Sequence, residues 1–184
     1  MIKLRDILNE IGETTDTYEY TTKKELKLIG PADPTEGGFY TSIYEFTGDD
    51  GEVYKVNIDA FTMYDEDKNI VPNPIVEIAF KSKSTGFGST NIGLRQAFKV
   101  IATVMKIAKT FADKYDWVDG FKFTVADPLK DSHVGKLELY KTFIKKQFPN
   151  AKIETNPQYR SPAMISALGP APEDKFGPTI VRFR

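Results

Sequence analysis

The chain has 184 residues, of which 40% are hydrophobic and 28% charged, as in an ordinary globular domain. Its formal net charge of −1 gives no electrostatic argument for nucleic acid or an anionic membrane as a partner. The absence of cysteine excludes disulfides, thiolate catalysis and cysteine-ligated zinc, and it fits a reducing compartment. A chain of this length folds comfortably as one domain.

The first segment, residues 2–11, has the spacing of apolar residues that places them on one face of a helix. A helix this short is marginal alone in water, so it must pack against something. One interpretation is packing on its own domain. The other is docking on a partner protein, with the polar residues 13–22 as a tether. The candidate partner-binding residues are Leu4, Ile7, Leu8 and Ile11.

Strand signals dominate the next part of the chain. Residues 39–46 and 53–61 alternate in the way that strands do, and Gly48-Asp49-Asp50-Gly51 between them predicts a hairpin turn. A third run at 75–81 follows a proline-rich break, and the three runs together predict an antiparallel meander. A short strand is also expected over residues 26–29.

Helical periodicity begins after a turn rich in glycine and hydroxyl residues over 83–93. A broad apolar stripe predicts a helix over 94–115 that lies across a sheet. The elements expected after it are a strand over 121–125, a helix over 134–147, a strand over 151–155, a helical turn over 164–168 and an edge strand over 179–183.

These elements define an α+β fold with a mixed, mostly antiparallel sheet and a β-β-β-α-β-α core, preceded by a short N-terminal amphipathic helix. The expected organisation is a helix and tether over 1–22, the core over 23–155, and a proline-rich tail with a terminal edge strand over 156–184.

The order of three antiparallel strands, a glycine-containing turn, a long helix, a strand and a shorter helix resembles the GNAT acetyltransferases over residues 40–154. In that family the turn offers backbone N–H groups to the pyrophosphate of acetyl-CoA. The physical basis is general, because unpaired amides and the positive end of a helix dipole attract anions. The resemblance therefore implies these cofactor-binding residues: Gly86, Gly88, Ser89, Thr90, Asn91, Gly93 and Arg95.

The same resemblance implies two catalytic residues. The stretch Leu137-Glu138-Leu139-Tyr140-Lys141 is similar to the leucine-tyrosine pattern near the end of GNAT domains, where the tyrosine protonates the departing thiolate. Tyr140 occupies that position. Glu77, on the third strand of the meander, is the candidate general base for an amine.

The glycine-rich turn differs from the family's usual Gln/Arg-x-x-Gly-x-Gly/Ala pattern, since it reads Gly86-Phe87-Gly88 and later Ile92-Gly93-Leu94-Arg95. Three stretches of the chain, residues 1–10, 97–104 and 136–140, also resemble small proteins of tailed bacteriophages that have no assigned activity. Two hypotheses follow. The first is a phage-type accessory or virion-associated protein that uses the GNAT-like fold as a protein-binding scaffold, without catalysis and with no cofactor. The alternative is an acetyl-CoA-dependent N-acetyltransferase.

Under the first hypothesis the partners are phage structural proteins, and the open edge of the terminal strand permits a homo-oligomer. A nucleic-acid partner is not expected. No apolar run reaches the roughly 20 residues of a membrane span, and charged residues interrupt residues 2–11, unlike a secretory signal. The expected location is the host cytoplasm or the virion. His133 is the only histidine, so no metal site is expected.

Overall fold

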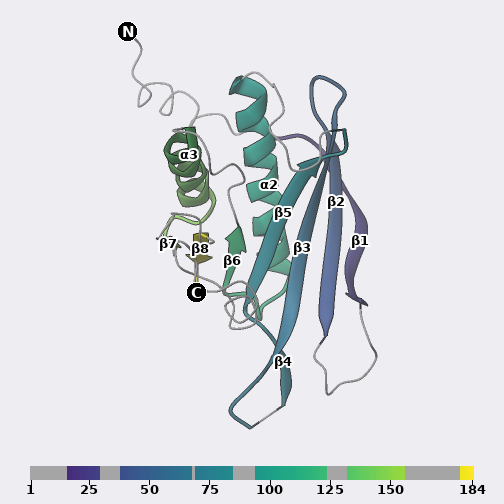
Figure 1. The fold of residues 1–184 in the computed structure, drawn as a ribbon, viewed down its shortest axis with the longest axis vertical. Coiled ribbons are helices and arrows are strands. Elements are labelled where there is room, and N and C mark those ends of the chain that lie inside the picture. The colour runs from purple at the N-terminus through teal and green to yellow at the C-terminus, as the bar shows by residue number, and fades with distance from the viewer. Residues whose placement is uncertain (1–15, 30–37, 68, 85–93, 124–131, 156–178) are drawn as a thin grey trace, which may run out of the picture.

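The computed structural model describes residues 16–29, 38–67, 69–84, 94–123, 132–155 and 179–184. Within them an open, mixed sheet of eight strands is covered on one face by two helices (Figure 1). The elements are β1 (Tyr20–Ile29), β2 (Phe39–Thr47), β3 (Val53–Tyr64), β4 (Ile70–Pro72), β5 (Ile75–Ser82), α2 (Leu94–Lys114), β6 (Gly120–Phe123), α3 (Ser132–Gln147), β7 (Lys152–Thr155) and β8 (Thr179–Arg182). The α+β class and the mostly antiparallel sheet are confirmed. The predicted N-terminal helix, the glycine-rich turn and the helical turn at 164–168 lie outside the described residues.

The sheet has the order β1-β2-β3-β5-β6-β8-β7, with β4 attached to the far end of β3. The predicted meander is confirmed as β2, β3 and β5, which pair antiparallel in succession. In the turn that joins β2 to β3, Gly51 has φ +79°, a left-handed conformation that glycine adopts without steric cost. The pairing of β5 with β6 is parallel, and α2 forms the crossover between them.

The core lies between the sheet and the two helices. Alternate residues of β3, including Val56 and Ile58, are fully buried, and so are Ile107 of α2 and Ile144 of α3. The broad apolar stripe predicted for residues 94–115 is the face of α2 that covers the sheet. Three rings from different elements stack in sequence at one end of this core: Tyr18 lies 5.6 Å from Phe46, which lies 5.2 Å from Tyr54.

The first strand is longer than predicted. β1 begins at Tyr20, six residues before the expected start, because two register shifts between Thr22 and Lys27 break the period-2 pattern that marks a strand in sequence. Tyr18 is also buried, at 7% exposure. From residue 16 onward, the stretch considered as a tether includes the buried Tyr18 and the first residues of β1.

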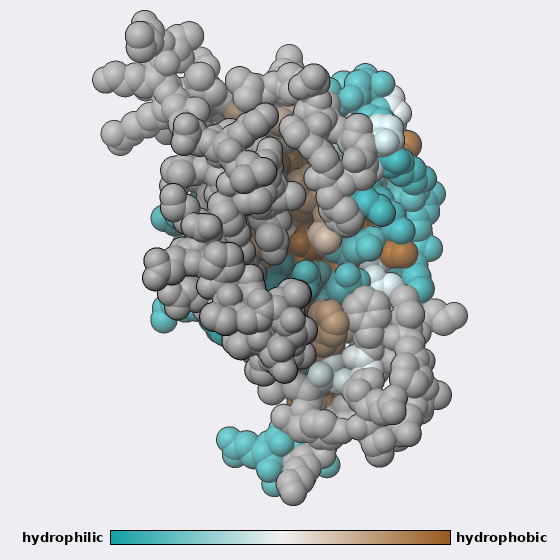
Figure 2. All heavy atoms as spheres, in the orientation of Figure 1, coloured by the Kyte–Doolittle hydropathy of each residue, from teal (hydrophilic) through white to brown (hydrophobic). Residues whose placement is uncertain are grey.

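The last strand, β8, is not the predicted edge strand, because it pairs with β6 on one side and β7 on the other. The alternation of apolar and polar residues shows which face of a strand is buried, and Val181 is indeed fully buried. It does not show whether the strand has a neighbour on each of its two edges. β1 and β7 are the edges of the sheet, and β1 carries Lys23, Lys24 and Glu25, charged residues of the kind that protect an edge from pairing. Figure 2 shows hydrophilic residues along this side of the molecule.

Gly120 begins β6 at a crowded position, between Ile75 of β5 and Arg182 of β8. A Cβ atom there would lie 2.3 Å from the carbonyl oxygen of Val181 and 2.8 Å from Cδ1 of Ile75. We expect Gly120→Ala to lower the free energy of unfolding by about 1–3 kcal/mol, the usual cost of overpacking, in a urea titration. Gly51→Asn is the control, because its surroundings are open and asparagine tolerates the left-handed region. Equal stability of the Gly120 variant and the wild type would contradict this account of β6.

Candidate functional site

β5 and β6 pair over a short stretch and then separate. Their parallel register consists of Ile75 with Gly120, Val76 with Phe121, and Glu77 with Lys122. β5 continues to Ser82, still paired with β3, but no described strand pairs with its other edge beyond Glu77. Figure 1 shows the two strands diverging toward the end of the molecule where α2 begins. Within the described residues, β5 and β6 therefore pair at these three positions only.

The main chain of β5 presents hydrogen-bonding groups toward this divergence. The N–H of Lys83 donates to the carbonyl of Val53 at 2.9 Å, which fixes the phase of the antiparallel ladder between β5 and β3. Because alternate residues of such a ladder bond to opposite sides, the N–H and C=O of Phe80 point away from β3. They face the side of β5 on which no described strand pairs at this level. A ligand in extended conformation can use such groups as a neighbouring strand does.

Glu77, the candidate base, lies on the face of the sheet opposite the helices. It belongs to a row of side chains that crosses four strands at one level, from Thr41 through Asp59 and Glu77 to Lys122. The Glu77 carboxylate lies 3.1 Å from Nζ of Lys122. The Asp59 carboxylate accepts a hydrogen bond from Thr41, and burial, together with the charge of Glu77, raises its pKa. We call this row the polar row.

Tyr140, the candidate acid, lies on the other face of the sheet. Its ring packs 5.4 Å from the ring of Phe123, the last residue of β6 and the one that follows the final β5–β6 pair. Burial raises the pKa of Tyr140 to about 12, so the hydroxyl is protonated at neutral pH. Tyr140 and Glu77 thus flank the point where β5 and β6 part, one on each face of the sheet.

The candidate cofactor-binding residues from Gly86 to Gly93 lie outside the described residues. Arg95 belongs to the first turn of α2, but its side chain is also outside them. Since α2 begins at Leu94, its N-terminal end, the positive end of the helix dipole, directly follows the turn in the chain.

Three residues that the sequence did not single out hold the start of this turn. The Glu52 carboxylate accepts hydrogen bonds from the hydroxyl of Ser82 at 2.6 Å, the hydroxyl of Ser84 at 2.7 Å and the N–H of Ser84 at 3.0 Å. Donors converging on the carboxylate lower the pKa of Glu52. No sequence pattern marks this cluster, because Glu52 is 30 residues from Ser82 and 32 from Ser84.

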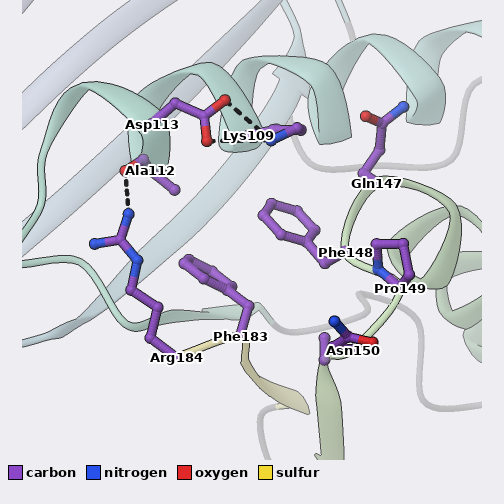
Figure 3. A pocket seen from close by; sticks show the side chains of 10 residues that line it. Lys109, Ala112, Asp113, Gln147, Phe148, Pro149, Asn150, Phe183 and Arg184 are labelled. Carbon is purple, nitrogen blue, oxygen red and sulfur yellow. Dashed lines mark hydrogen bonds and ion pairs between the residues drawn. The ribbon is translucent and has the colours of Figure 1, made fainter.

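A separate pocket of about 200 Å³ lies at the other end of α2, where α3 and β8 also end (Figure 3). The rings of Phe148 and Phe183 stack at 4.7 Å in its wall. Its two cationic side chains already have partners, since Lys109 pairs with Asp113 at 3.0 Å and Arg184 donates to main-chain carbonyls at the end of α2. This arrangement ties the two helices to the last strand.

The remaining candidate residues, Leu4, Ile7, Leu8 and Ile11, lie outside the described part of the chain. Within that part, no group of three or more histidine, cysteine, aspartate or glutamate side chains is placed to hold a metal ion. None of the described helices has the length and apolar character needed to cross a membrane. No family model, curated protein or solved structure matches the chain.

The Glu52 cluster predicts a pH dependence of stability. A carboxyl group whose pKa is lowered by folding stabilises the protein above its unfolded pKa, near 4.5, and loses this effect as pH falls through the folded value. We therefore expect wild type to melt at a higher temperature than Glu52→Gln at pH 7, with the difference shrinking below pH 4.5. Glu66→Gln, in the exposed turn after β3, is the control. A difference that stays constant across this range would exclude the Glu52 carboxylate as its source.

Proposed function

We propose that the chain is an acetyl-CoA-dependent N-acetyltransferase with a GNAT-like fold. The observation that carries the proposal is the divergence of β5 and β6 after Glu77 and Lys122. The proposal assigns the main-chain N–H and C=O of Phe80, which point away from β3, to the amide-containing arm of the cofactor. The chain order of three antiparallel strands, a crossover helix and a parallel strand supports the resemblance to the family.

The two candidate catalytic side chains fit this proposal because they approach the divergence from opposite faces. Tyr140 is protonated and packs beside the end of β6, where it can protonate the departing thiolate. Glu77 lies at the last paired position, where it can accept a proton from an amine that reaches the thioester from the polar row. The start of the turn proposed to bind the cofactor phosphates is fixed by Glu52.

Acetyl-CoA is expected to raise the melting temperature, because a ligand that binds only the native state stabilises it by mass action. Tyr140→Phe should keep this shift and reduce acetyl transfer by about 100-fold or more, since it removes the proton donor and keeps the ring. Tyr115→Phe, another partly buried tyrosine in the same core, is the matched control and should retain activity. The absence of a shift at millimolar acetyl-CoA would refute the proposal.

A second function, docking on a protein partner such as a phage structural protein, is supported by the anchoring of the N-terminal segment. The main-chain N–H of Tyr18 donates to the hydroxyl of Thr103 at 2.9 Å, and Nζ of Lys106 donates to the hydroxyl of Thr17 at 3.2 Å. These contacts belong to residues 17 and 18. The predicted amphipathic helix, residues 2–11, lies outside the described residues and is proposed as a separate docking element.

Deleting residues 1–12 tests this second function, because the deletion leaves the contacts of residues 16–18 in place. The melting temperature should change by less than about 2 °C, or roughly 1 kcal/mol, while association with the partner is lost in co-purification. The control is Leu4→Ala combined with Leu8→Ala, which shortens two side chains of the predicted apolar face in the full-length chain. A large fall in melting temperature on deletion would instead place the helix in the core of its own domain.

A further inference from the structure

A primary amine of the protein itself lies at the point where β5 and β6 part. Lys122 forms the last parallel pair with Glu77, and its Nζ lies 3.1 Å from the Glu77 carboxylate. The same Nζ is held 5.5 Å from the ring centre of Phe61, the exposed aromatic residue of β3. An aromatic face and a carboxylate together are a favourable environment for an ammonium group.

The side chain of Lys122 is 27% exposed and that of Glu77 is 41% exposed, so solvent reaches both groups. Among the described lysines, Lys122 alone belongs to the final β5–β6 pair. It lies on the face opposite Tyr140, the side from which the proposed reaction requires an amine to approach.

We propose that Lys122 is itself an acetyl acceptor, so that the protein acetylates its own side chain with Glu77 as the proton acceptor. This inference rests on the proposed acetyltransferase function. It adds a modification site to the protein. It also means that the Lys122 ammonium serves as a model for the external amine that the polar row would bind.

The reaction balances without a further reactant. The Lys122 ammonium gives one proton to Glu77, and the free amine attacks the carbonyl carbon of the thioester. A C–N bond forms and the C–S bond breaks. Tyr140 protonates the departing thiolate, and the second proton lost by the nitrogen restores the Tyr140 hydroxyl. The products are N-acetyl-Lys122, free CoA and one proton, which Glu77 returns to water.

Acetylation would change the electrostatics of the polar row. It removes the positive charge of Lys122 and breaks its ion pair with Glu77. The Glu77 carboxylate then lacks this cation beside it, which favours binding of an external cationic amine at the same place.

The test is to incubate the full-length protein with acetyl-CoA and follow acetylation of individual lysines by peptide mass spectrometry. Lys109 is a matched internal control, because it also pairs with a carboxylate, at 3.0 Å, and its side chain is more exposed, at 43%. Uncatalysed acetylation therefore favours Lys109. We expect Lys122 to react at least about tenfold faster than Lys109, with a first-order rate constant independent of protein concentration.

Glu77→Gln should slow acetylation of Lys122 by at least about tenfold and leave Lys109 unchanged. Asp113→Asn, the equivalent change beside Lys109, should leave Lys122 unchanged. The inference is overturned if Lys122 reacts no faster than Lys109, or if Glu77→Gln leaves its rate intact. When acetyl-CoA still raises the melting temperature in those cases, only self-acetylation is refuted. Without that thermal shift, the acetyltransferase proposal and this inference both fail.

Discussion

β5 and β6 run parallel, and two parallel neighbours cannot be joined by a tight turn. The chain must cross the sheet between them, and α2, with 21 residues or about 30 Å, provides this crossover. That single pairing determines where the helix lies over the core and why its N-terminal end lies near the end of β5. It also determines where Tyr140 lies, because α3 continues from β6 and packs beside α2.

Among the described residues, the parallel pairing covers three residues on each strand. β6 is held on its other side by β8, which pairs with all four of its residues, and Gly120 makes that approach possible. β5 pairs with β3 from Glu77 to Ser82. Pairing on one edge of a strand does not exclude pairing on the other, since Glu77 pairs both with Asp59 of β3 and with Lys122 of β6.

The sequence predicted most of the elements because their faces differ in polarity. The alternation of Tyr54, Val56 and Ile58 with polar residues identified β3, and the stripe on α2 reflected burial against the sheet. Which strands pair with one another was harder to predict from the sequence. The position of β8 between β6 and β7 could not be read from alternation, and the irregular register of β1 concealed its first six residues. Partners that lie far apart in the chain leave no local signal.

The same reasoning applies to the site. Tyr140 and Glu77 were identified through resemblance, and no local property of either residue indicated that they would flank one position. Lys122 was not identified at all, since a lysine in a strand is ordinarily a solvated residue. Two features of the structure make Lys122 significant. The register places it opposite Glu77, and the two strands diverge directly beyond this pair. An ion pair on an exposed sheet face contributes little to stability, about 0–1 kcal/mol. The proposed acetyltransferase function assigns this row of Thr41, Asp59, Glu77 and Lys122, which crosses four strands, a chemical role at the divergence.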